Sequence, residues 1–359
     1  MKWTSRVSAA CLVLCLSACH KTERLTQQEH ITVTELTARL KPRCVGRFLI
    51  NMPVDALSAG RTEVQGVTIE TRKITQEEYG TAMDALSKKL NATKSTNGYR
   101  FVYADGEIEG IKGSRYFISL GKPYASTDSE RLIEAYKWDQ GYQIKLQISA
   151  SDAKNSTYFK NMPSVRDDPD MTDTPERTQR VVSMLSRIRG REDDDIPTEP
   201  GVCFKGGFLP GAATSAEKTS RDFILESMHD VGFSMNTYSN ISEETTLLQR
   251  TDMNAAIEAA NGRTIRKGRI ELQGIQQAEE WLSDGLTGAK VRGHYFVLEA
   301  NSKIGSTATP MVSLDMDNGG RLPGIDGDRQ LTQASLTEGE AVALWDAVSR
   351  SLRPRPNGF

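Results

Sequence analysis

The sequence predicts an α+β protein of two similar domains, each a mainly antiparallel sheet with packed helices. Strand-like alternation of apolar and polar residues is interrupted by amphipathic helical stretches, which is typical of antiparallel α+β domains. The second observation is an internal echo: Cys44 and Cys203 each open a segment that continues through Gly and Phe-Leu to a proline turn. Amphipathic stretches that end in arginines, at 181–189 and 342–353, recur at nearly the same offset. The echo indicates a tandem duplication, or at least two domains of one fold.

Residues 1–18 read as a secretory signal, because Lys2 and Arg6 precede an apolar run, Val7–Leu16, that is too short to span a bilayer. The run ends in Leu-Ser-Ala-Cys, which resembles the lipobox of bacterial lipoproteins, where the cysteine thiol takes a diacylglycerol. We therefore expect Cys19 to be lipidated. An ordinary signal peptide, cut just before Cys19 to release a soluble protein, is the alternative.

The rest of the chain divides by composition into a tether, two domains and a linker. No later apolar run approaches the roughly 20 residues of a membrane helix, so we expect membrane contact only through the anchor. The polar segment after the anchor is expected to be flexible, so that the domains can reach away from the membrane. The predicted boundaries are a lipidated tether at 19–40, an N-terminal domain at 41–190, an acidic and proline-containing linker at 191–200 and a C-terminal domain at 201–359.

Turn and capping signals set the order of elements in the first half. Thr75 and Glu78 form a capping box that starts a helix, and the turn at 139–141 closes a hairpin. Thr174 is the expected N-cap of the last helix of this half, with proline at the first helical position. We expect strands at 67–74, 100–103, 114–120, 131–138 and 142–149, and helices at 75–90 and 175–189.

The second half is expected to begin with a helix at 217–230 and to contain a short helix at 279–286. Thr337 and Glu340 form another capping box, which starts the terminal helix. The expected strands are 233–238, 265–273, 293–300 and 311–316, and the terminal helix is 337–353.

The linker contains a run of four acidic residues, Glu192, Asp193, Asp194 and Asp195, and two prolines. Its charge and prolines argue against burial and against a continuous helix, so we first expect a solvated linker. The alternative is that the acidic run contacts a basic partner, since complementary charge speeds association.

The charge balance argues against nucleic acid as a partner. The chain has 45 Lys and Arg against 47 Asp and Glu. Removal of residues 1–18, which contain two basic residues and no acids, leaves 43 against 47, a net charge of about −4. Nucleic-acid binding requires a basic surface, which this balance does not supply.

Two cysteines besides Cys19 remain after removal of the signal, and pairing is the default in an oxidising compartment. A bridge from Cys44 to Cys203 would close a loop of over a hundred residues. In the chain-entropy model such a bridge stabilises the fold by on the order of 5 kcal/mol. Two buried free thiols are the alternative.

No catalytic or metal-binding motif stands out. The histidines and the mature cysteines lack metal or redox spacing, and nucleophile-elbow, phosphate-loop and dinucleotide-binding motifs are missing. Carboxylate pairs, such as Asp315 with Asp317, fit solvated strand faces or turns better than acid–base catalysis. We therefore predict a protein with no catalytic residues, no metal and no cofactor.

The cysteine segments carry a resemblance to a known family. A signal and lipobox are followed by Cys-x-Gly-x-Phe at 44–48, Asn-Met-Pro at 51–53, Gly-Val-Cys at 201–203 and Gly-Gly-Phe at 206–208. This pattern is similar to the immunity proteins cognate to type VI secretion phospholipase effectors, in the form with distinct N-terminal and C-terminal domains. The resemblance covers nearly the whole mature chain.

The resemblance implies a periplasmic inhibitor that binds a secreted phospholipase effector, blocks its active site and protects the cell from its own and sibling toxin. Both domains would grip the enzyme, with the cleft near residues 190–201 at the centre. His20 after the cysteine resembles outer-membrane sorting, so we expect a periplasmic, lipid-anchored protein at the outer membrane. The alternative function is a periplasmic ligand-binding or envelope-assembly lipoprotein, and a carboxylate enzyme without a sequence signature is least favoured.

Overall fold

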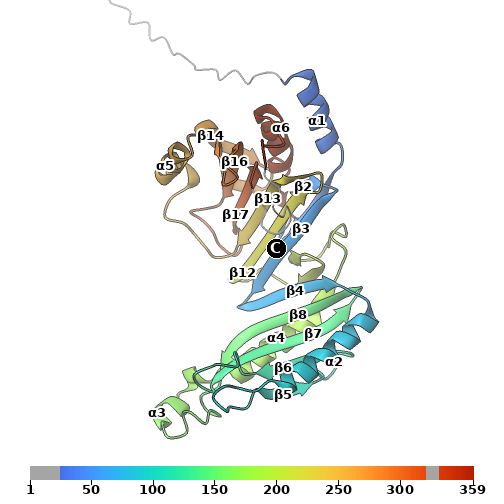
Figure 1. Ribbon diagram of the computed structural model, residues 1–359, viewed down its shortest axis with the longest axis vertical. Helices are drawn as coiled ribbons and strands as arrows, with labels where there is room; N and C mark the ends of the chain where they lie inside the picture. Colours follow the sequence, from blue (N-terminus) through green and yellow to red (C-terminus); the bar gives the residue numbers. More distant parts are fainter. Residues whose placement is uncertain (1–24, 321–330) are drawn as a thin grey trace, which may run out of the picture.

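The computed structural model describes residues 25–320 and 331–359 (Figure 1). The predicted signal, Cys19 and His20 therefore lie outside the described residues. The first half contains α1 (Gln27–Thr37), β1 (Leu40–Val45), β2 (Phe48–Pro53), β3 (Ala56–Val64), β4 (Val67–Lys73), α2 (Gln76–Ala92), β5 (Val102–Gly106), β6 (Arg115–Ser119), β7 (Glu130–Asp139), β8 (Tyr142–Ser151), α3 (Pro163–Arg166), a 3₁₀ turn (Pro169–Met171), α4 (Thr174–Arg187) and β9 (Arg189–Gly190). The second half contains β10 (Gly201–Phe204), β11 (Gly207–Pro210), β12 (Glu217–Leu225), β13 (Met228–Tyr238), a 3₁₀ turn (Leu247–Gln249), α5 (Asp252–Ala259), β14 (Arg263–Leu272), β15 (Ile275–Leu286), β16 (Arg292–Ala300), β17 (Met311–Asn318), α6 (Glu338–Ser349) and β18 (Arg353–Pro354).

One twelve-stranded antiparallel sheet runs through both halves. Its order is β14-β15-β16-β17-β13-β12-β3-β4-β8-β7-β6-β5, and the pairing of β12 with β3 joins the halves. Read inward from either edge, the strands follow the same order: β5 to β8, β4 and β3 in one half, and β14 to β17, β13 and β12 in the other. The predicted α+β class with two similar, mainly antiparallel domains is confirmed. We call the two parts the N-terminal lobe (β3 to β8, α2 and α4) and the C-terminal lobe (β12 to β17, α5 and α6).

The opening hairpins of the two halves are exchanged between the lobes. Phe48 and Ile50 of the β1–β2 hairpin belong to the hydrophobic core of the C-terminal lobe. Phe204 and Leu209 of the β10–β11 hairpin belong to the core of the N-terminal lobe. β9, at the end of the first half, pairs with β11 of the second hairpin. β18, at the end of the second half, pairs with β2 of the first hairpin. Separation of the lobes would expose both cores to water, which makes the joint between them stable.

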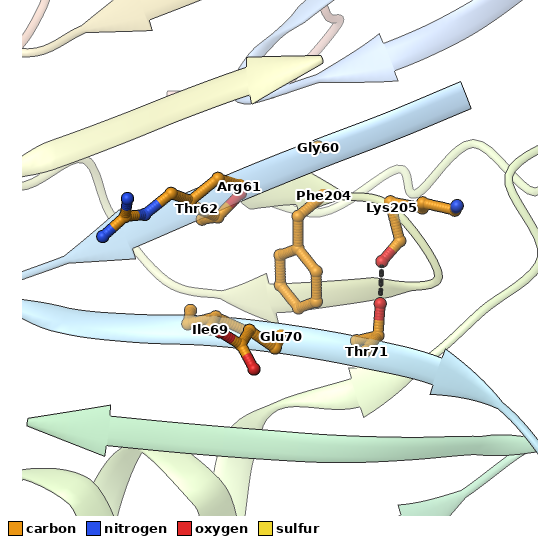
Figure 2. Close-up of a pocket in the computed structure, with 8 residues that line it drawn as sticks. All are labelled: Gly60, Arg61, Thr62, Ile69, Glu70, Thr71, Phe204 and Lys205. Carbon is orange, nitrogen blue, oxygen red and sulfur yellow. Dashed lines mark hydrogen bonds between the residues drawn. The ribbon is translucent and has the colours of Figure 1, made fainter. Parts of the chain in front are cut away.

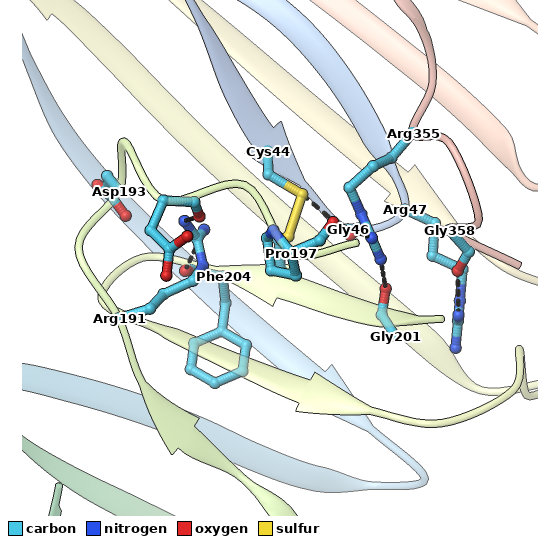
Figure 3. Close-up of a disulfide and its surroundings, with 12 residues drawn as sticks. Cys44, Gly46, Arg47, Arg191, Asp193, Pro197, Gly201, Phe204, Arg355 and Gly358 are labelled. Carbon is cyan, nitrogen blue, oxygen red and sulfur yellow. Dashed lines mark hydrogen bonds between the residues drawn. A yellow bond between two sulfur atoms is a disulfide. The ribbon is translucent and has the colours of Figure 1, made fainter. Parts of the chain in front are cut away.

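The predicted disulfide between Cys44 and Cys203 is present, with a Cα–Cα distance of 5.7 Å (Figure 3). Both cysteines are buried. Next to the bridge, Gly46 and Cys203 exchange two backbone hydrogen bonds, of 2.9 and 2.8 Å. The disulfide therefore ties the two exchanged hairpins to each other.

The capping boxes at Thr75 and Thr337 form as predicted and start α2 and α6. α4 begins at Thr174 itself, with Asp173 at the N-cap position in place of the predicted Thr174. Both α4 and α6 end earlier than predicted, because the residues after them pair with the hairpins as β9 and β18.

Part of the predicted flexible tether is instead the helix α1. A capping box between Thr26 and Glu29 starts it. The Thr337 hydroxyl donates a hydrogen bond to Glu29 Oε1 at 2.6 Å, which links α1 to the first turn of α6. Leu36 packs against the core of the C-terminal lobe. The chain therefore enters the fold on the C-terminal lobe (Figure 1).

Two helix predictions are wrong. Residues 217–230 form β12 and the start of β13, and residues 279–286 belong to β15. In β12 the inward positions include Glu217 and Arg221, and in β15 they include Glu280, all buried in ion pairs. A half-buried strand is recognised by alternation of apolar and polar residues, and charged residues at inward positions interrupt that pattern.

The predicted linker is buried only in part, because six of the ten residues at 191–200 are exposed. Arg191 and Pro197 are buried. Arg191 donates hydrogen bonds to the backbone oxygens of Asp195 at 2.7 Å and Gly207 at 3.2 Å. A guanidinium with five donors can be buried when carbonyl oxygens of the surrounding loop accept its hydrogen bonds.

Candidate functional site

The central strands β4, β3, β12 and β13 have one closed and one open face. In β3, Thr62 and Val64 are buried, whereas Leu57 and Arg61 on the opposite face are exposed. Because side chains alternate between the faces of a strand, the whole sheet centre is divided in this way. The exchanged hairpins, the disulfide and the linker cover the closed face. α2 flanks the open face in the N-terminal lobe, and α5 flanks it in the C-terminal lobe.

Two buried ion pairs stabilise the closed face. Arg47 donates two hydrogen bonds to the carboxylate of Glu217, at 2.7 and 2.8 Å. Arg221 Nη2 donates to Asp193 Oδ2 at 2.8 Å. Burial alone would raise the pKa of Asp193, but the charge and hydrogen bonds of Arg221 outweigh burial and leave the pKa below its ordinary value. The closed face is thus a set of internal contacts, in which these two ion pairs are buried.

The structure places the predicted partner-binding residues Glu192 to Asp195 at this closed face and its rim. Three of them have partners within the chain: Lys73 and Tyr142 for Glu192, Arg221 for Asp193, and Lys41 and Arg43 for Asp194. The side chains of Glu192, Asp194 and Asp195 are exposed. Contact of this acidic run with another protein stays a prediction.

In the N-terminal lobe, a cavity of about 400 Å³ lies between α2 and the open face. On its floor, Lys145 Nζ lies 2.9 Å from Glu134 Oε1 and 3.8 Å from Glu70 Oε2. The Tyr136 hydroxyl donates to Glu134 at 3.0 Å. Burial, followed by the charge of Glu134, raises the pKa of Tyr136. The cavity therefore places the neutral Tyr136 phenol and the charged groups of Lys145 and Glu70 beside apolar residues of α2.

A second cavity, of about 560 Å³, lies where β3 and β4 separate. The two strands pair only between their turn and the pair Thr62–Ile69, after which β3 follows β12 and β4 follows β8. We call this gap the fork. Phe204, the last residue of β10, and Lys205, in the turn that follows, lie between its arms (Figure 2). The two cavities adjoin, since Glu70 and Thr71 line both.

In the C-terminal lobe the open face is acidic. Tyr295 donates a hydrogen bond to Asp315 Oδ1 at 3.3 Å. Burial, together with the charges of Asp317 and Glu299, raises the pKa of Asp315 to about 6. Partial desolvation also raises the pKa of Asp317, although its side chain is exposed. These carboxylates lie on a strand face, as the sequence indicated, and would attract a basic group.

The described residues offer surfaces for contact and no recognisable metal site. In residues 25–320 and 331–359, no group of three or more His, Cys, Asp or Glu side chains is placed to hold a metal ion. Within the same ranges, no helix is long and apolar enough to cross a membrane.

Sequence reasoning missed the open face and the fork, because both depend on the pairing of β3 with β12, which are distant in sequence. Alternation in 56–64 and 217–225 was the available signal, and charged inward residues obscured it in the second segment.

Two lobes joined through a buried disulfide, with an open polar sheet face between flanking helices, define the architecture of a binding protein. The chain belongs to the Tle cognate immunity protein 4 family. The N-terminal domain of that family matches residues 41–191, and its C-terminal domain matches residues 195–357. A comparison with curated protein sequences gave no match.

Solved structures share the fold at low sequence identity. The Tle4–Tli4 complex contains a chain with a TM-score of 0.69 and 20% identity, over 90% of this chain and 99% of that one. The apo immunity protein TplEi of the type VI secretion system of Pseudomonas aeruginosa has a TM-score of 0.68 and 21% identity, over 89% and 98%. TplEi complexed with an "L" peptide has a TM-score of 0.63 and 20% identity, over 89% and 99%.

Proposed function

We propose that this protein is a periplasmic immunity protein that binds a cognate type VI secretion phospholipase effector and blocks its active site. The observation that carries the proposal is the match of both halves to the two domains of one immunity family. The solved relatives support it, because one is a Tle4–Tli4 complex and another is an immunity protein bound to a peptide.

The open face supports inhibition by contact. A stable protein complex buries roughly 1,200–2,000 Å² in total, which demands a broad surface of fixed shape. The buried disulfide and the exchanged hairpins hold both lobes in one arrangement, so little ordering entropy is lost on binding. We infer that the protein acts stoichiometrically and not as an enzyme.

The acidic residues Glu192 and Asp195 remain candidate contacts within this proposal, since their side chains are exposed. Replacement of both by the neutral amides Gln and Asn should slow association with the effector if they meet a basic patch. An unchanged association rate at low salt would remove them from the interface.

Lipidation at Cys19 would hold the inhibitor at the surface that a phospholipase attacks, and His20 favours the outer membrane. Because α1 is docked on the C-terminal lobe, the anchor would leave the fold from that lobe. Cys19→Ser tests this part of the proposal: we expect an exported but unanchored protein that protects less well. Undiminished protection would show that the anchor is dispensable.

Co-expression with a candidate cognate phospholipase effector tests the function. We expect the full-length protein to prevent killing when the toxin is directed to the periplasm, and to co-purify with it. A variant without residues 1–18 is the matched control, since it stays in the cytoplasm and should not protect. Killing in the presence of the exported protein, without co-purification, would contradict the proposal. Stabilisation by a small envelope ligand, without a protein partner, would favour the alternative of a ligand-binding lipoprotein.

A further inference from the structure

The fork leaves two strand edges open inside a continuous sheet. β3 pairs with β12 along its whole length, yet its pairing with β4 stops after Thr62 and Ile69. Within the described ranges, no strand pairs with residues 56–61 on the β4 side or with residues 70–73 on the β3 side. Open edges of this kind are templates for pairing with another chain.

The pairing register of β3 with β4 shows which backbone N–H and C=O groups point into the fork without a strand partner. The turn between β3 and β4 consists of residues 65–66, both with positive φ, as in a two-residue hairpin turn. The residues that flank such a turn exchange hydrogen bonds, and the direction of the backbone groups then alternates along each strand. The backbone groups of Ser58 and Gly60 therefore point into the fork from β3, and those of Thr71 and Lys73 point into it from β4.

Lys205 bridges the gap between β4 and β3. The Thr71 hydroxyl donates to the Lys205 backbone oxygen at 2.5 Å, and Lys205 Nζ donates to the Ser58 backbone oxygen at 2.5 Å. The Phe204 ring lies between the two strands as a floor (Figure 2). The remaining cavity of about 560 Å³ lies within the usual range of ligand sites.

We propose that the fork receives an extended segment of the cognate effector, which adds a strand between β3 and β4. An extended main chain is the matching occupant, because its N–H and C=O groups alternate with the same period as the open groups. Arg61 and Lys205 line the cavity with one carboxylate, Glu70, so the segment carries an acidic side chain near them. The inference rests on the proposed function and adds the mode of recognition.

Amide hydrogen exchange tests the inference, with the intact protein alone and in complex with the purified effector. We expect exchange at Gly60 and Thr71 to slow at least about tenfold on binding, because both amides gain acceptors. Amides of β12 from Lys218 to Ile224, which already pair with β13 on one side and β3 on the other, should change little and serve as the internal reference. A complex that forms without protection of residues 56–61 and 70–73 would overturn strand addition and leave the proposed function intact. Failure to form any complex would overturn both.

A charge-reversal pair provides a second readout. Arg61→Glu should weaken effector binding by about tenfold, since it places a carboxylate against the acidic side chain of the segment. Arg269→Glu, on the far edge strand β14, is the matched control and should leave the affinity unchanged. Equal affinities for the two variants would contradict the acidic segment. Protection of the same amides by self-association, detected as a dimer in light scattering, would overturn the assignment to the effector.

Discussion

Gly60 and Arg221 lie directly opposite each other where the two lobes meet. Each is the middle residue of a nine-residue strand, β3 and β12, and the antiparallel register pairs them. The equivalent positions of the two halves therefore meet at one point, as expected for a pair of similar units related by an approximate two-fold axis. The Arg221 side chain lies across Gly60, with its guanidinium held by Asp193 (2.8 Å) and Ser58 (3.0 Å).

Gly60→Ala should destabilise the joint. A Cβ at this position would lie 2.7 Å from Arg221 Cδ and 2.8 Å from the Ser220 backbone oxygen, and the backbone oxygen cannot move away freely. We expect a loss of about 1–3 kcal/mol in the free energy of unfolding, as for other overpacked sites. Gly80→Ala in α2 is the control, because no atom lies within 4 Å of its Cβ position; it should gain roughly 0.5–1 kcal/mol. Equal effects in denaturant titrations would contradict the close approach at Gly60.

Asp193→Asn should cost about 3 kcal/mol near neutral pH, because it leaves the buried Arg221 without its counter-ion. Asp194→Asn is the matched control in the same loop, and its exposed ion pairs predict a loss of at most about 1 kcal/mol. The folded pKa of Asp193 is lowered, so its contribution is complete above the unfolded pKa of about 4 and fades as the pH falls through the folded value. Wild type and Asp193→Asn should therefore converge in strongly acidic solution. A difference that is independent of pH would argue against the ion pair as its source.

Asp315→Asn should stabilise the protein above pH 6. The folded pKa of about 6 lies above the ordinary value, so the ionised carboxylate costs stability that grows as the pH rises from about 4 to about 6. We expect a gain of roughly 1–3 kcal/mol near pH 7.5 and none near pH 4. Thermal unfolding at both pH values measures the effect, and an equal gain at both would contradict it.

Loss of the disulfide should cost about 2–5 kcal/mol, since the bridge closes a long loop and joins the exchanged hairpins. Cys44→Ser with Cys203→Ser should lower the unfolding midpoint, whereas reductant should have little effect on the variant. If reductant lowers the unfolding midpoint equally in wild type and variant, the disulfide is not the source of its effect.

The sequence predicted the elements whose signals are local. The capping boxes at Thr75 and Thr337, the hairpin at 139–141 and the cysteine pair all depend on neighbouring residues or on elimination, and all are present. The strands β12 and β15 were predicted to be helical, because their inward residues are charged and find their partners far away in sequence. No local pattern encodes the exchange of the hairpins or the pairing of β3 with β12, since both are settled by tertiary packing.

For the candidate site, the sequence likewise indicated the class of protein but not the surfaces that depend on tertiary pairing. The lack of catalytic motifs argued against an enzyme, the resemblance of the cysteine segments indicated an immunity protein, and the family match confirms that resemblance. The open face and the fork arise from strand pairing across the two halves, and the acidic linker, which was the visible candidate, is largely bound within the chain.

Titration of the purified cognate phospholipase with this protein tests the central claim most directly. The account predicts that hydrolysis of phospholipid vesicles falls linearly with added protein and ends near one inhibitor per enzyme. Full lipase activity at a tenfold excess of folded protein would contradict it.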